Sequence, residues 1–365
     1  MKKVPHLLVC ISGHGFGHLA QVAPVLNALH DLSPDIRLTI RSTIPQPLLR
    51  QRIRPEFNHL QEATDFGMVM RSALQVNVAA SMQAYVDFHA DWPAKVAAEA
   101  QRLQRLAPDL LLTDVAYLPL AAADRIGLPA VAMCSLNWAD IFAHYCHAMP
   151  EADRIQQEIA SAYACASCFL QPTPSMPMPW LPERMVIGPL AEAGRQRRFE
   201  IERQLGLQSE DRLVLVSMGG IPTRVALDRW PRLPGVKWLV QGDWSLPQAR
   251  DDMHAFESLG MPFSDLLASC DLLLTKPGYG AFVEAAVSGV PVLFVRRDDW
   301  PEQPYLVDWL AQVRHCQGID PLQLERGGFV DALEALLEKT KPLPLAATGH
   351  LQAARYMLSR LAEAI

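Results

Sequence analysis

Short apolar runs alternate with stretches of helical periodicity along the first half of the chain. Val22, Val25 and Leu26 recur on one face of a helix predicted over residues 18–32. The predicted strands of this half are 6–12, 36–42, 109–114 and 129–135, and a second predicted helix covers 118–126. Several buried strands that alternate with helices indicate a mostly parallel sheet covered on both faces.

A proline-rich stretch interrupts this pattern, and the alternation then restarts. Its prolines suit neither a helix nor a central strand, so residues 173–195 are predicted to be a linker. The strands predicted after it are 212–220, 236–242, 271–280 and 290–297, and the predicted helices are 263–270, 281–289 and 302–313. Two of these strands, 212–220 and 271–280, end in glycines.

The chain of 365 residues exceeds one ordinary hydrophobic core, which favours two domains. The predicted fold class is α/β, with two Rossmann-like, doubly wound parallel-sheet domains facing a cleft. The predicted boundaries are 1–172 for the N-terminal domain, 173–195 for the linker, 196–345 for the C-terminal domain and 346–365 for a terminal helix. Ligands of such sheets bind beyond the C-terminal ends of the strands, so polar residues there are the candidates for function.

Composition narrows the possible function classes. The formal net charge is −6, and RQRR at 195–198 is the densest basic cluster, which is too short to follow a nucleic-acid backbone. No apolar run reaches the roughly 18 residues of a membrane span, so we expect a cytoplasmic protein, with peripheral membrane contact left open. Seven scattered cysteines agree with this compartment. Cys165 and Cys168 lack the second pair that a zinc ribbon needs.

The stretch ISGHGFGHLA, residues 11–20, places two histidines among three glycines after the first strand. His14 and His18 have the spacing of a zinc-binding helix, but the glycines disfavour a helix and no glutamate lies between them, so we predict no metal. Two interpretations remain: the histidines bond the backbone of a tight turn, or one is a general base with a pKa near neutral. Asp114 ends a strand and could orient such a base, or it could cap the following turn.

Glycines at two strand ends of the second half could cradle a phosphate. Gly219 and Gly220 end one strand, while Gly278 and Gly280 precede a helix. The free N–H groups and positive dipole end of such a helix suit a diphosphate. Glu284 follows on that helix and could bind both hydroxyls of a ribose. The same residues could equally be turn glycines and a solvated helix charge.

Further polar residues follow other predicted strands. Glu302 and Gln303 suit the hydroxyls of a sugar, although an acidic residue is also a common choice at a helix start. Asn137 and Asp140 could line the acceptor side of the cleft. Between them, Trp138 could stack on a sugar or fill the core.

The segment DLLLTKPGYGAFVEAAVSGVPVLFVRRDDWPEQPY, residues 271–305, resembles the nucleotide-sugar-binding segment of glycosyltransferases with the GT-B fold. These include the families that make plant and antibiotic glycosides and the peptidoglycan N-acetylglucosaminyltransferase. The shared pattern is supplied in order by Gly278, Glu284, Gly289, Pro291, Glu302 and Gln303. Nearly the whole chain also resembles the glycosyltransferase-like N-terminal region of plant L-arabinokinases, through GHGFGH, TDV, GYG and VRRD.

The resemblance implies a role for each candidate residue. It assigns the donor phosphates to Gly219, Gly220, Gly278 and Gly280, the ribose to Glu284, and the donor sugar to Glu302 and Gln303, with Lys276 and Tyr279 in the same donor site. His18 matches the base that opens the first helix, and Asp114 matches its carboxylate partner. His14 and Gly17 match substrate-lining positions. The chain departs from the family at Ala281, where members usually have Thr or Ser.

The predicted function is sugar transfer from a nucleotide-diphosphate sugar, with a UDP-sugar favoured, to an unknown hydroxyl acceptor. The reaction would invert the anomeric carbon without a metal or another cofactor, because glycine-loop N–H groups and the helix dipole would meet the charge of the leaving diphosphate. Arg296 or Arg297 could add positive charge. Two alternatives stay open: a sensor or accessory subunit that binds the nucleotide sugar without transferring it, and a nucleotide-sugar epimerase on the same fold.

Overall fold

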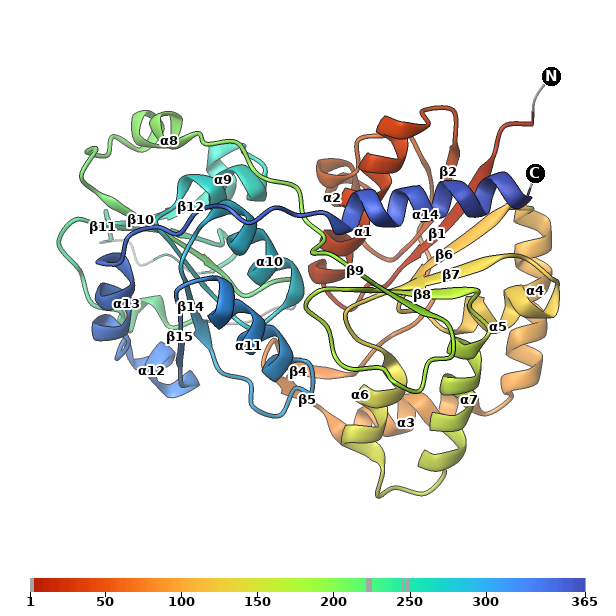
Figure 1. The fold of residues 1–365 in the computed structure, drawn as a ribbon. Coiled ribbons are helices and arrows are strands. Elements are labelled where there is room, and N and C mark those ends of the chain that lie inside the picture. Colours follow the sequence, from red (N-terminus) through yellow and green to blue (C-terminus); the bar gives the residue numbers. More distant parts are fainter. Residues whose placement is uncertain (1–2, 221–224, 245, 247–249, 365) are drawn as a thin grey trace.

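Two parallel sheets form the framework of the molecule and lie side by side in Figure 1. The computed structural model describes residues 3–220, 225–244, 246 and 250–364. In sheet order, the first sheet contains β3 (Asn58–Leu60), β2 (Arg37–Arg41), β1 (His6–Ile11), β6 (Leu110–Asp114), β7 (Ala130–Met133), β8 (Cys168–Pro172) and β9 (Arg184–Ile187). The second contains β12 (Met253–Ala255), β11 (Val236–Val240), β10 (Arg212–Ser217), β13 (Leu272–Thr275), β14 (Val292–Val295) and β15 (Cys316–Ile319). The predicted α/β fold class is confirmed.

Helices connect and cover the strands. The first half carries α1 (Phe16–Leu32), α2 (Gln46–Arg52), α3 (Val78–His89), α4 (Trp92–Leu106), α5 (Leu118–Arg125), α6 (Trp138–Cys146) and α7 (Ala152–Ala164), with a short antiparallel pair, β4 (Met70–Ser72) and β5 (Gln75–Val76). The second half carries α8 (Arg198–Leu205), α9 (Phe263–Ser269), α10 (Tyr279–Ser288), α11 (Gln303–Val313), α12 (Pro321–Arg326), α13 (Val330–Leu337) and α14 (Gly349–Ala364). Every strand and helix named in the sequence analysis has a counterpart among them.

The apolar runs form strands because both of their faces are buried. All six residues of β1 are buried. Side chains alternate across a strand, so Leu7 and Val9 join one hydrophobic cluster, while Leu8 and Cys10 join another on the opposite face of the sheet. A continuous apolar run is the pattern of a parallel strand with helices on both sides.

One hydrophobic cluster runs through both halves of the chain. Leu213 of β10 belongs to the same cluster as Leu7 of β1. Helix α14 contributes Met357 to this cluster, because it crosses back from the second half and packs against α1 (Figure 1). The two sheets are therefore joined by shared packing as well as by the connecting chain.

Two boundaries differ from the sequence-based expectation. Strand β9 lies within residues 173–195, which we predicted to be a linker, and it pairs with β8 at the edge of the first sheet. Prolines are tolerated at a sheet edge, so the proline-rich composition did not reveal this strand. Helix α1 begins at Phe16 and thus includes Gly17, which we took as part of a glycine loop.

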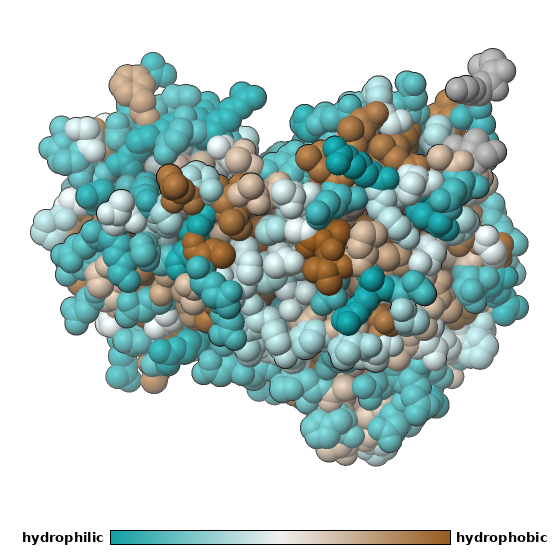
Figure 2. Space-filling model, viewed as in Figure 1, coloured by the Kyte–Doolittle hydropathy of each residue, from teal (hydrophilic) through white to brown (hydrophobic). Residues whose placement is uncertain are grey.

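Two observations bear on contact with a membrane. Within the described residues, the helices are too short or too polar to cross a bilayer. On the face shown in Figure 2, hydrophobic side chains gather in small separate areas among hydrophilic ones.

The packing of α14 predicts a contrast between two residues of that helix. Met357 is fully buried, whereas Leu351 is 39 % exposed. Met357→Ala should lower the free energy of unfolding by about 2–5 kcal/mol, because it removes a buried side chain and leaves a cavity. Leu351→Ala should change it by less than about 1 kcal/mol. Urea denaturation measures both, and equal losses would contradict the docking of α14 on α1.

Candidate functional site

A cavity of about 370 Å³ lies where the C-terminal ends of the two sheets meet. Its lining comes from the segments that follow β1, β2 and β7 in the first half and β10, β11, β12, β13 and β14 in the second. This is the position at which open parallel sheets bind ligands. Most of the residues predicted from the sequence line this cavity.

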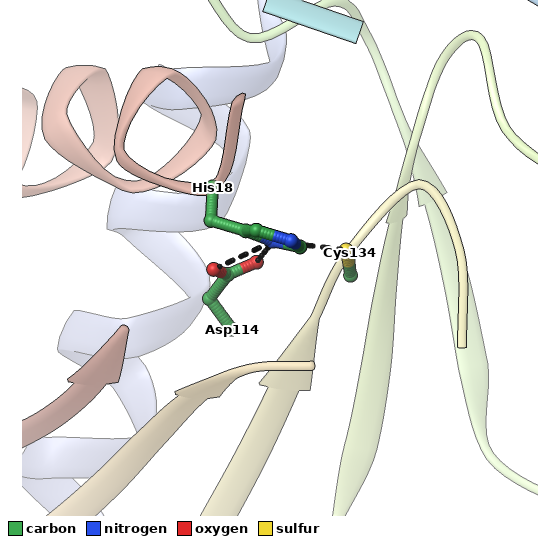
Figure 3. A group of neighbouring side chains, drawn as sticks. All are labelled: His18, Asp114 and Cys134. Carbon is green, nitrogen blue, oxygen red and sulfur yellow. Dashed lines mark hydrogen bonds and ion pairs between the residues drawn. The ribbon is translucent and has the colours of Figure 1, made fainter. Parts of the chain in front are cut away.

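The first feature of the cavity is a bonded histidine–aspartate pair. Asp114 is the last residue of β6 and lies beside Ile11, the last residue of β1. His18 lies in the first turn of α1, so its Nδ1 reaches both Asp114 oxygens, at 3.2 Å from Oδ1 and 3.0 Å from Oδ2 (Figure 3). The carboxylate accepts a hydrogen bond from Nδ1–H, which leaves Nε2 as the acceptor nitrogen of the neutral ring.

The electrostatic environment separates the two histidines of the motif. Burial by itself lowers the pKa of His18, but the Asp114 carboxylate, together with the charges of Asp65 and Glu302, outweighs burial and raises the pKa above its ordinary value of 6.5. Burial, His18 and the charges of Lys276 and Arg297 lower the pKa of His14 to about 3. His18 can therefore accept a proton near neutral pH, whereas His14 stays uncharged.

His14 lines the cavity within an aromatic environment. Its ring stacks on Trp300 with centroids 6.2 Å apart and meets Trp138 edge-on at 5.1 Å. Gly67 has φ of +64°, and a Cβ there would lie 2.6 Å from the His14 ring. Trp138 is fully buried and donates its Nε1–H to Asp65 at 2.7 Å, so it fills the core. The stacking alternative for Trp138 is not supported.

Cys134 completes a buried group that could hold a metal ion. Ligand atoms of His18, Asp114 and Cys134 lie within 4.8 Å of one another (Figure 3). Zinc binds cysteine as the thiolate. Burial and the neighbouring Asp114 charge raise the pKa of Cys134 well above its ordinary value, so the sulfur stays protonated. His18 Nδ1, the nitrogen within this group, also bonds Asp114, and the geometry fits a hydrogen-bonded group better than a metal centre.

Two cations reach the cavity from the second sheet. A Cβ placed on Gly219 would lie 3.2 Å from Lys276 Cε, and one on Gly278 would lie 3.9 Å from Lys276 Nζ, so both glycines lie beside this ammonium group. Burial, followed by the Arg297 charge, lowers the pKa of Lys276 to about 8. Arg296 points elsewhere, to Asp320.

Helix α10 begins at the same place. Gly278 is its N-cap and supplies no side-chain hydrogen bond to the first turn. The first N–H groups of a helix without such a cap can bond an anion, and the helix dipole favours negative charge there. The cavity thus combines Lys276, Arg297 and a helix N-terminus.

Gly220 and Gly280 line the cavity and also allow the two halves to approach closely. A Cβ on Gly220 would lie 2.9 Å from the Phe16 ring, and a Cβ on Gly280 would lie 2.7 Å from Ala20 Cβ. Gly17 lies on the same contact, 3.7 Å from the Cβ position of Gly280. Larger residues at either glycine would push α1 away from the second sheet.

Glu284 lines the cavity but already has a partner. Arg52, at the end of α2, donates hydrogen bonds to both of its carboxylate oxygens. A carboxylate offers about four acceptor positions, so Glu284 retains capacity for further hydroxyl groups. Nothing in the sequence pattern indicated Arg52, because it lies 232 residues from Glu284.

Glu302 and Gln303 behave differently from each other. Glu302 lines the cavity, accepts the Ser135 hydroxyl at 2.6 Å and accepts Trp300 Nε1–H at 3.2 Å. Gln303 is not among the lining residues, because its amide bonds the backbone N–H of Arg297 and the side chain of Asp298. The structure therefore places only the acidic residue of this pair at the cavity.

Three other predicted residues have structural partners. Tyr279 lines the cavity, but its hydroxyl accepts the Leu190 N–H and donates to the Thr173 carbonyl. Asn137 is the N-cap of α6 and bonds Asp140 in the first turn, and neither is among the lining residues. The acceptor-side position expected for Asn137 and Asp140 is therefore not observed.

Sequence reasoning missed the aromatic end of the cavity. Phe256 and Phe263 line it together with Gln241, and the Arg52 guanidinium lies 5.9 Å from the Phe263 ring. Phe256 follows β12, a three-residue strand that the hydrophobic pattern did not predict. The face of an apolar aromatic ring suits a nucleobase.

Comparisons with known proteins agree with this architecture. No protein-family model matches the sequence. The chain is 28% identical to the L-arabinokinase of Arabidopsis thaliana over 322 residues, which is 82% of this chain and 29% of that protein. It therefore spans less than a third of the length of this curated relative.

Solved structures of glycosyltransferases share the fold. The glycosyltransferase of kitacinnamycin superposes with a TM-score of 0.60 at 15% identity, over 100% of this chain and 96% of its own. Spinosyn forosaminyltransferase superposes with a TM-score of 0.59 at 14% identity, over 100% of this chain and 96% of its own. Phytolacca americana UGT2, complexed with UDP-2-fluoro-glucose and pterostilbene, superposes with a TM-score of 0.57 at 14% identity. The superposition covers 98% of this chain and 94% of that enzyme. The fold is that of the GT-B glycosyltransferases, as the sequence resemblance implied.

The bonded pair predicts how His18 titrates. Asp114→Asn should lower the pKa of His18, because the charge that opposes burial is lost. In the wild-type protein this pair stabilises the fold fully below pH 6.5, and the contribution is lost as the pH rises through the raised pKa of His18. NMR titration of the histidine ring signals, with His18→Gln to assign the resonance, measures the shift. An unchanged pKa in Asp114→Asn would contradict the pairing.

Proposed function

We propose that this chain transfers a sugar from a nucleotide-diphosphate sugar, a UDP-sugar in particular, to a hydroxyl group of an acceptor. The observation that carries the proposal is that His18, bonded to Asp114 beneath it, lines the same cavity as Lys276 and the start of α10. A proton acceptor and an anion-binding site in one cavity are what this reaction needs.

The donor would lie along the edge of the second sheet. Its diphosphate would contact Lys276 and the N–H groups at the start of α10, beside Gly219. Glu284 would share its carboxylate between Arg52 and the ribose hydroxyls. Glu302 would accept a hydroxyl of the sugar with the lone pairs that Ser135 and Trp300 leave free.

His18 would act as the general base. Its Nε2 would take the proton of the acceptor hydroxyl, and Asp114 would stabilise the imidazolium that forms. The acceptor oxygen would bond the anomeric carbon as the bond from that carbon to the diphosphate oxygen breaks. Attack from the face opposite the leaving group would invert the anomeric carbon. Lys276 and the α10 N–H groups would receive the charge of the leaving diphosphate without a metal ion.

The relatives support the substrate class. The kitacinnamycin and spinosyn proteins are named as glycosyltransferases, and the Phytolacca americana enzyme holds a UDP-sugar analogue. The L-arabinokinase similarity covers a minor part of that protein, so its kinase activity is not part of the proposal. Ala281, which lines the cavity without a hydroxyl, favours the alternative of a nucleotide-sugar sensor.

Replacement of His18 tests the catalytic role. His18→Ala should reduce transfer from a UDP-sugar by roughly 10²–10⁴-fold, since a general base contributes about that much, while UDP affinity stays within about threefold. Transfer is measured as UDP release over a panel of hydroxyl acceptors in the presence of EDTA, and affinity by calorimetry.

His30→Ala is the matched control, because His30 lies in the last turn of the same helix. It should keep full activity. Unchanged transfer in His18→Ala would refute the base assignment. Binding of UDP-sugars without transfer to any acceptor would favour the sensor. Inversion of a stereocentre of the sugar in the absence of an acceptor would favour the epimerase.

Lys276 gives the nucleotide affinity a defined pH dependence. The lowered pKa of about 8 means that the ammonium group loses its proton just above neutral pH. UDP affinity should therefore fall about tenfold between pH 7 and pH 9, because only the charged form attracts the diphosphate. Lys276→Met should bind weakly with little dependence on pH, whereas exposed Lys339→Met should behave as wild type. Calorimetry across this range measures the profile, and a flat wild-type curve would contradict it.

A further inference from the structure

Arg297 is a buried cation whose charge is compensated only in part, by the Tyr145 hydroxyl and by the charges of Asp299 and Glu302. Its side chain is 3% exposed, and the carboxylate it approaches, Asp299, lies 3.9 Å from Nε and is itself half exposed. Among the described residues, Nε has no hydrogen-bond partner, and Nη2 meets Met70 Sδ at 4.0 Å. The guanidinium lies 4.0 Å from the Trp300 ring. Burial of a charge without a bonded carboxylate costs free energy unless a ligand supplies the counter-charge.

The neighbouring arginine shows the usual arrangement at this strand end. Arg296 is 48% exposed and bonds Asp320, so solvent and a carboxylate both compensate its charge. Arg297 instead lines the cavity. Arginine remains protonated in proteins, and the lowered pKa of Arg297 reflects the strength of the desolvation around it.

The surroundings of Arg297 place it at the sugar end of the cavity. Trp300 lies between Arg297 and Glu302, stacking on the guanidinium and donating Nε1–H to Glu302. His14 lies on the same indole. Lys276 lies instead beside Gly219 and Gly278, the glycines of the proposed diphosphate site. The two cations therefore have different nearest neighbours, although the charge of Arg297 still contributes to the lowered pKa of Lys276.

The hairpin of β4 and β5 helps to exclude water from this end. Met70 of β4 contacts the Arg297 guanidinium, and Leu74, between the two strands, packs against the hydrophobic cluster of the second sheet. A charged hydrogen bond is stronger where water is excluded. A neutral hexose would offer only hydroxyl groups to this guanidinium, whereas a carboxylate could accept two parallel N–H bonds and neutralise it.

We propose that the donor sugar is a hexuronic acid, whose carboxylate binds the Arg297 guanidinium on the face of Trp300. This proposal rests on the proposed function and specifies its donor class. Arg297 would then determine donor specificity, and Glu302 would accept a hydroxyl of the same sugar.

The experiment compares UDP, UDP-glucose, UDP-glucuronate and UDP-galacturonate by calorimetry at fixed ionic strength and without acceptor. At least one uronate should bind wild-type protein about tenfold to a hundredfold tighter than UDP-glucose, as expected for a charged hydrogen-bonded pair. Arg297→Gln should lose this preference and keep its affinity for UDP within about threefold. Arg296→Gln, at the adjacent position, should retain the preference.

Three other results would overturn the hexuronate donor or the proposed function. Equal or tighter binding of UDP-glucose by the wild-type protein would overturn the proposal without any variant, so a misfolded Arg297→Gln cannot mask the answer. A parallel loss of affinity for UDP and all sugars in Arg297→Gln would make Arg297 a phosphate ligand and also overturn it. Failure of UDP itself to bind would refute the proposed function first, whereas UDP binding without a uronate preference refutes the hexuronate donor alone.

Discussion

Burial of ionisable groups in one cavity is the constraint on which the site depends. Burial, with the charges of His18, Lys276 and Arg297, lowers the pKa of His14 to about 3, so this histidine stays neutral. His18 lies four residues further along the chain, and its pKa is raised instead of lowered because Asp114 bonds its ring. Burial and different neighbouring charges thus separate two similar histidines into a proton acceptor and an uncharged lining residue.

Contacts between the halves connect ligand binding with domain packing. Arg52 reaches from the first half to Glu284 in the second, and Gly280 lets α10 approach Ala20 of α1. A ribose on Glu284 would share the carboxylate with Arg52. Donor binding and the contact between the halves would therefore involve the same carboxylate. Residues of α1, α10 and α14 share one hydrophobic cluster, whose packing also holds the two halves together.

Much of the fold and part of the site could be predicted from the sequence. Continuous apolar strands ending in glycines or Asp114 identified the cavity edge, because strand ends of a parallel sheet converge. The pattern could not show that Gln303 turns to Asp298, or that Asn137 and Asp140 bond each other, since residue types alone do not fix the direction of a side chain even toward partners near in sequence. Arg52 was missed because its partner Glu284 is distant in sequence, Phe256 because the short strand β12 was not predicted, and β9 because an edge strand tolerates prolines.

A crystal structure of the protein soaked with UDP tests directly where the donor diphosphate binds. We expect the diphosphate between Lys276 Nζ and the N–H groups at the start of α10. Its terminal phosphate should be directed toward Glu302 and Arg297, and His18 Nε2 should face that end. A diphosphate bound away from Lys276, or a nucleotide outside the cavity, would contradict it.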